Sequence, residues 1–82
     1  MSKALLIIDV QQGFLKSYKE LPDRIAKVAQ KFKDNNDTVI AFQHLDDMKG
    51  SPIEFGTAGA EIPTILTDKA DITIQKKIPY IF

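Results

Sequence analysis

The stretch ALLIIDVQQGF, residues 4–14, decides the fold that we expect for this chain. Five apolar residues lead directly to Asp9. A run that is apolar on both faces is typical of a covered strand inside a parallel sheet. A carboxylate at the carboxyl end of such a strand lies where open α/β folds bind their ligands. The stretch therefore predicts an α/β protein with a polar site that begins at Asp9.

A helix is predicted over residues 22–34. Pro22 suits the first turn of a helix, and the residues 35–37 (Asn-Asn-Asp) favour the turn that ends one. Apolar residues recur between them at i, i+3, i+4 and i+7, the spacing of a single buried stripe. The stripe consists of Ile25, Val28, Ala29 and Phe32. We expect it to pack on the sheet.

Two further strands are predicted, over residues 38–42 and 71–75, with a long loop over 45–63 and one or two helical turns within 61–66. Strand, helix and strand in this order give parallel units with right-handed crossovers. We expect the first half of a three-layer, Rossmann-like sheet, with the strand order 3-2-1 and one main helix.

That order places the strand of residues 4–9 at the outside of the sheet, although its sequence is typical of a central strand. Because an unpaired apolar edge tends to pair with another chain, we expect self-association or a complementing carboxyl-terminal half. The apolar residues 78–82 (IPYIF) are a second segment expected to associate.

The length and composition of the chain argue against several classes of function. Eighty-two residues allow one domain, over residues 1–82, and the expectation is a truncated one. Eleven basic residues balance eleven acidic ones, which argues against nucleic acid or an anionic membrane as a partner. The chain has no cysteine, no apolar run long enough to span a bilayer and no signal-peptide cleavage site. We expect a cytoplasmic protein without a cofactor.

Polar residues gather at the carboxyl ends of all three predicted strands. They are Asp9 with Gln11, Gln43 with His44, and Lys76 with Lys77. Since these ends share one rim of a parallel sheet, the three groups are expected to converge and to bring a carboxylate near a lysine. Strand ends are also polar simply because they meet water, so any single residue carries little weight.

Four segments in order resemble one family over nearly the whole chain. DVQQGF, QHLDD, FGTAGAEIPTIL and ITIQKKIPYIF are similar to the amino-terminal half of the isochorismatase-like cysteine hydrolases, which include nicotinamidases and other small amidases. The resemblance implies a catalytic set of Asp, Lys and Cys that hydrolyses a small amide or a related molecule. In that set Asp9 is the acid/base and Lys76 stabilises the charged intermediates, while Gln11, Phe14 and His44 shape the substrate pocket.

Two features depart from the family. Its nucleophilic cysteine belongs to the second half of the family fold, so this chain alone is expected to be inactive. Nicotinamidases also place an Asp and a His two residues apart after the second strand, whereas this chain has His44 and Asp46 in the reverse order. Without an evident third ligand, we expect no metal.

Other functions remain open from the residues. The chain could be a non-catalytic domain that associates through its open sheet edge. A phosphoacceptor role for Asp9 is disfavoured, because the position two residues on is Gln11 and the residue before Asp9 is Ile8. The segment 56–59 (Gly-Thr-Ala-Gly) lacks the lysine of a phosphate-binding loop.

Overall fold

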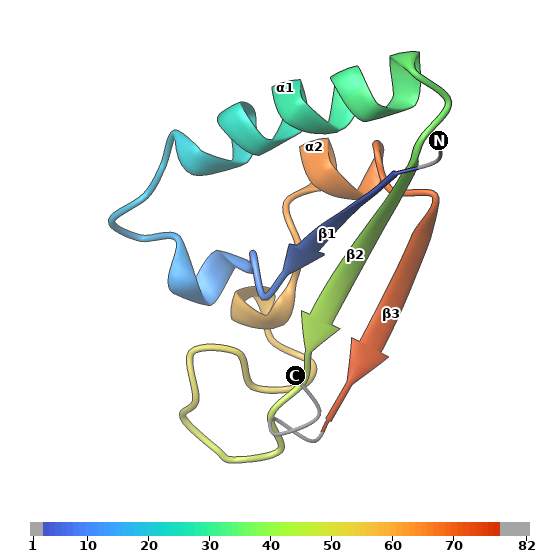
Figure 1. The fold of residues 1–82 in the computed structure, drawn as a ribbon. Coiled ribbons are helices and arrows are strands. Elements are labelled where there is room, and N and C mark those ends of the chain that lie inside the picture. The colour runs from blue at the N-terminus through green and yellow to red at the C-terminus, as the bar shows by residue number, and fades with distance from the viewer. Residues whose placement is uncertain (1–2, 78–82) are drawn as a thin grey trace.

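The computed structural model describes residues 3–77, which fold into one sheet with helices on a single face (Figure 1). The chain forms, in order, β1 (Ala4–Ile8), a 3-10 turn (Gln12–Phe14), α1 (Leu21–Asp34), β2 (Thr38–His44), a second 3-10 turn (Ala58–Ala60), α2 (Thr64–Thr67) and β3 (Ile72–Lys76). The predicted α/β class is confirmed, and the strand and helix bounds agree with the expected ones within two residues.

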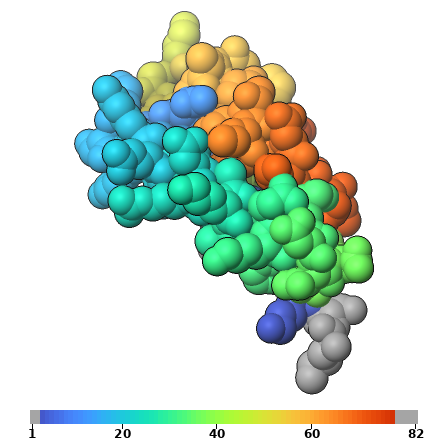
Figure 2. All heavy atoms as spheres, turned by 90° about the horizontal axis from the view of Figure 1, so that it is seen from above, coloured from blue at the N-terminus to red at the C-terminus, as the bar shows by residue number. Residues whose placement is uncertain are grey.

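The sheet is parallel throughout and has the strand order β1-β2-β3. This is the predicted order 3-2-1, with β1 at one outside position of the described sheet. β2 runs two residues further than predicted, so that Gln43 and His44 lie on the strand itself. Residues of α1 and α2 contact each other, and in Figure 2 the atoms of the two helices lie side by side on the face seen from above.

The hydrophobic core lies between the sheet and this helix layer. It contains Ile7, Ala26, Ala29, Val39, Ala41, Ile62 and Leu66, each at most 6% exposed. Ala29, Val39 and Leu66 are completely buried. The small alanines allow α1 to approach the strands closely, and they fix which side of the helix faces the sheet.

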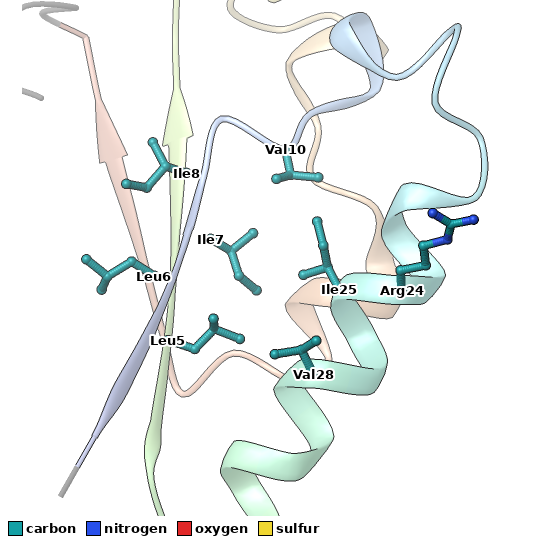
Figure 3. A pocket seen from close by; sticks show the side chains of 8 residues that line it. All are labelled: Leu5, Leu6, Ile7, Ile8, Val10, Arg24, Ile25 and Val28. Carbon is teal, nitrogen blue, oxygen red and sulfur yellow. The ribbon is translucent and has the colours of Figure 1, made fainter.

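The predicted stripe of α1 was wrong at one position. Val28 is 44% exposed, whereas Ala26, which periodicity did not select, is 6% exposed. Ile25 and Phe32 pack at the margin of the core. The reason is that Val28 lies beside the open edge at β1, where no further strand follows in the described residues (Figure 3). Periodicity marks an apolar side of a helix but not where the sheet beneath it ends.

The turn after α1 forms as expected. Asn36 has a φ of 60°, the left-handed conformation expected just after α1. The apolar residues 78–82, expected to associate, lie outside the described residues. Within residues 3–77, no helix is long and apolar enough to cross a membrane.

Candidate functional site

The three strand ends meet at one rim of the sheet, because the strands are parallel and in register. Ile8 pairs with Phe42, and His44 pairs with Lys76. The backbone N–H of Asp9 continues the ladder by donating to the carbonyl of Phe42 over 3.2 Å. The arrowheads in Figure 1 show all three strands ending on the same side.

An ion pair between Asp9 and Lys76 is the central feature of this rim. Lys76 Nζ lies 3.0 Å from Asp9 Oδ1, and the two side chains are 5% and 35% exposed, respectively. Oδ1 is buried and has no hydrogen bond of regular geometry within the described residues, so the ammonium is the charge that it faces. Lys76 contacts Oδ1, and the Asp9 side chain is partly exposed. The second carboxylate oxygen of Asp9 can therefore accept a proton or contact a ligand.

The backbone of Asp9 is also unusual. Its φ is 58°, a left-handed conformation that Asp and Asn tolerate better than most residues. Such conformations cost about 1–3 kcal/mol and cluster at functional sites. The turn directs the chain out of β1 immediately after the strand, and it places the carboxylate at the rim rather than on a face of the sheet.

Gln11 holds two other parts of the rim together. It is completely buried, and its Nε2 donates to the carbonyls of His44 and Ala60 at 2.7 Å each. Its Oε1 accepts a hydrogen bond from the His44 N–H at 2.9 Å. Gln43, which is 9% exposed, donates to the same Ala60 carbonyl at 2.7 Å. Gln11 therefore supports the site by fixing the end of β2 against the loop that precedes α2.

The remaining predicted pocket residues occupy different positions. His44 is partly buried at the end of β2, opposite Lys76 in the register. Phe14 is 44% exposed in the 3-10 turn that follows Asp9. The structure thus brings Asp9, His44 and Lys76 to one rim and leaves Phe14 on the adjoining surface. Lys77 is exposed and lies over the ring of Phe55, with Nζ 5.3 Å from the ring centre.

One backbone contact near the site was not predicted from the sequence. The carbonyl of Pro52 lies so close to both Gly13 and Gly59 that a Cβ built on either glycine would approach its oxygen to about 2 Å. The two glycines therefore allow the long loop to contact the turn after Asp9. A sequence motif could not have shown this, because the approach depends on how residues 45–63 fold back over the rim.

Asp46, considered above together with His44 as a possible metal ligand, is engaged in local hydrogen bonds. The Asp46 carboxylate accepts a hydrogen bond from the Met48 N–H at 2.9 Å. That bond, the Ser51 hydroxyl and nearby His44 lower the pKa of Asp46, against a smaller opposing effect of desolvation. Within residues 3–77, no three His, Asp or Glu side chains lie close enough to hold a metal ion together.

Comparison with solved structures supplies parallels to this fold. The chain superposes on a proposed isochorismatase hydrolase from Oleispira antarctica (TM-score 0.76, 21% identity). It also superposes on a proposed isochorismatase from Burkholderia xenovorans LB400 (TM-score 0.79, 22% identity) and on a proposed isochorismatase-family hydrolase from Chromobacterium violaceum (TM-score 0.72, 19% identity). No protein-family model and no curated protein matches the sequence.

The extent of these matches is as informative as their quality. Each covers 93% of this chain but only 46%, 41% and 43%, respectively, of the solved chains. The chain therefore spans less than half of the length of the structures that it matches. It has the fold of part of an isochorismatase-type hydrolase, and the first half predicted from the sequence is consistent with that.

Proposed function

From the fold shared with isochorismatase-type hydrolases, we propose that this chain carries the acid–base part of a hydrolase site for a small amide or a related small molecule. The observation that supports this most directly is the Asp9–Lys76 ion pair at the carboxyl ends of parallel strands, where α/β proteins bind ligands. The nucleophile of the proposed site is a cysteine thiol from a segment outside this chain, which contains no cysteine.

Each residue has a defined part in the proposed reaction. Asp9 accepts the proton of the thiol, and the thiolate attacks the carbonyl carbon to form a tetrahedral intermediate. Collapse of this intermediate breaks the carbon–nitrogen bond, and Asp9 returns the proton to the leaving amine. Water then hydrolyses the acyl-enzyme. Lys76 holds the Asp9 carboxylate in place and stabilises the negative charge that develops.

On this proposal the chain alone does not turn over substrate. A positioned acid or base contributes about 10²–10⁴-fold to a rate. Amide hydrolysis at neutral pH needs far more, and most of it comes from the nucleophile and from oxyanion stabilisation. Asp9 and Lys76 can orient a substrate and move a proton, but they form no acyl intermediate.

A chimera tests the proposal. Residues 1–82 replace the matching part of the Burkholderia xenovorans protein, which supplies the rest of the fold, and hydrolysis of a panel of small amides is measured. We expect no turnover from the purified chain and measurable turnover from the chimera. In the chimera, Asp9→Asn should lower kcat by about 10²–10⁴-fold while the protein still folds cooperatively, because Asn tolerates the same backbone conformation but accepts no proton.

The two neighbouring lysines provide a matched control. Lys76→Ala should impair the chimera about as strongly as Asp9→Asn, whereas Lys77→Ala should have little effect, because Lys77 is exposed and lies over Phe55. Amide hydrolysis by the highly purified chain alone would contradict the proposal. So would a chimera in which the Lys77 variant is the more damaged of the two.

A further inference from the structure

The backbone of β2 forms hydrogen bonds with its two neighbouring strands in alternation. On the side of β1, the Phe42 carbonyl accepts from the Asp9 N–H at 3.2 Å. On the side of β3, the Leu45 N–H donates to the Lys76 carbonyl at 2.8 Å. His44 lies two residues after Phe42, so its N–H and carbonyl also point toward β1. However, β1 has ended by then, because the chain turns away at Asp9.

The side-chain amide of Gln11 takes the place of a strand at this position. Its Nε2 donates to the His44 carbonyl at 2.7 Å, and its Oε1 accepts from the His44 N–H at 2.9 Å. A primary amide offers the same donor and acceptor as a peptide group. The two bonds therefore extend the pairing of β2 by one residue beyond the end of β1. Gln11 is completely buried, and water does not compete for these bonds.

This amide is connected to both members of the Asp9–Lys76 ion pair. The Gln11 backbone N–H donates to the Asp9 carbonyl at 3.1 Å, within the turn in which Asp9 has its positive φ. On the other side, His44 pairs with Lys76 in the register. The bond from the Leu45 N–H then joins the end of β2 to the Lys76 backbone. The end of β2 is thus the link between Gln11 and the ammonium.

We propose that Gln11 is a positioning residue, whose amide acts through the end of β2 to hold Lys76 in contact with Asp9. It orients the two charged groups without touching the substrate, since it is completely buried and its amide is bonded to backbone groups. This inference deepens the proposed function, and its consequence for turnover rests on that function. The positioning itself can be measured in the chain alone.

Gln43 provides a matched comparison. It is 9% exposed, and it donates to the Ala60 carbonyl at 2.7 Å, as Gln11 does. Within the described residues, only Gln11 adds the pair of bonds to His44. The same substitution at both positions therefore separates the loss of the Ala60 bond from the loss of the bonds to β2.

Amide hydrogen exchange followed by NMR tests the proposal without any activity. In the wild-type chain, the His44 and Leu45 amides should exchange within about tenfold of Ala41, in the middle of β2. Gln11→Met keeps a side chain of similar length but removes the amide, and it should accelerate Leu45 exchange relative to Ala41 by about tenfold or more. Gln43→Met should leave this ratio unchanged.

A milder variant covers the case in which Gln11→Met does not fold. Gln11→Asn keeps the amide but is one methylene shorter, so it cannot reach both backbone groups of His44 in the same geometry. It should shift the ratio of Leu45 to Ala41 exchange in the same direction, by a smaller factor.

Lysine acetylation gives a readout at the ammonium itself. Lys76 is 5% exposed, whereas Lys77 is exposed, so an N-hydroxysuccinimide ester should modify Lys76 much more slowly in the wild type. Tandem mass spectrometry measures the two sites separately. Gln11→Met should raise the reactivity of Lys76 relative to Lys77 several-fold, and Gln43→Met should not.

The chimera described above connects the positioning to turnover. There Gln11→Met should lower kcat by about 10–100-fold with a nearly unchanged KM, because a displaced ion pair affects the reaction rather than the binding of substrate. An active chimera whose kcat is unaffected by this change would overturn the proposal.

Two results on the chain alone would also overturn it. One is a wild-type His44 amide that exchanges as fast as the amides of an exposed loop. The other is an equal response of Leu45 exchange and Lys76 acetylation in Gln11→Met and Gln43→Met. A chimera without any turnover would instead contradict the proposed function, while the exchange and acetylation experiments would still decide the role of Gln11.

Discussion

Gly13 and Gly59 are the residues at which a single methyl group has the clearest consequence. A Cβ on either one would lie about 2 Å from the Pro52 carbonyl oxygen, and a backbone carbonyl cannot rotate away as a side chain can. We expect Gly13→Ala and Gly59→Ala each to destabilise the fold by about 2–4 kcal/mol, as in other cases of overpacking and lost loop contacts. Urea denaturation followed by circular dichroism measures this.

Gly50→Ala is the comparison for these two variants. A Cβ there meets no atom within 4 Å, but the φ of 86° is unfavourable for alanine. Its cost should be about 1 kcal/mol, from backbone strain alone. If all three variants lost the same stability, the close approach of Pro52 would not be the reason why glycine is needed at positions 13 and 59.

At the level of the elements, adjacent residues of α1 should respond very differently to charge. Ala29 is completely buried against the sheet, whereas Val28 is 44% exposed beside β1. Ala29→Asp should abolish the cooperative thermal transition, because an unpaired buried carboxylate is very costly. Val28→Asp should keep the transition and lose about 1 kcal/mol or less. Cooperative unfolding of both variants would show that α1 packs through a different side.

The start of β3 is stabilised by a carboxylate, and this effect should depend on pH. Asp71 accepts hydrogen bonds from the Val39 N–H at 2.8 Å and from Lys33 Nζ at 2.9 Å. These two contacts lower the pKa of Asp71 in the folded chain, the Val39 bond most strongly. Since the folded value lies below the unfolded one, the stabilisation is complete above about pH 4 and is lost as the pH falls further.

Asp71→Asn tests this linkage in thermal melts between pH 7 and pH 2.5. The variant should melt below the wild type at pH 7, and the two should converge as the wild-type carboxyl becomes protonated. Asp47→Asn controls for the change in net charge, since Asp47 is an exposed residue of the long loop. If the difference in melting temperature between Asp71→Asn and the wild type stayed constant with pH, the charge of Asp71 would have no part in the stabilisation.

The elements themselves were largely predictable, because their signals are local. The apolar run before Asp9, the period of residues 22–34 and the turn chemistry at Asn36 each act within a few residues, and the structure confirms the strand, the helix and the turn that they predict. The exposure of Val28 was not predictable in this way. It depends on which strand lies at the edge of the sheet, and that is a property of the assembled fold.

The candidate site, too, was predictable only where it depends on local features of the sequence. Asp9 and the pair Lys76 and Lys77 could be selected because each follows a predicted strand, and parallel strands bring their ends together; the family resemblance then favoured Lys76. The bonds from Gln11 to Ala60 and the approach of Pro52 to two glycines involve the long loop, which has no periodicity. A single sequence does not show where such a loop folds back.

The parallel pairing of β1 with β2 also determines the order in which the chain can fold. Ala4 pairs with Thr38, so the first strand has no partner until more than thirty further residues have been synthesised. At translation rates of about 5–20 residues per second, that interval lasts about 2–8 s. Closing a loop of this length then costs about 3 kcal/mol in chain entropy. The segment that decides the fold is therefore the one that a nascent chain leaves unpaired for longest.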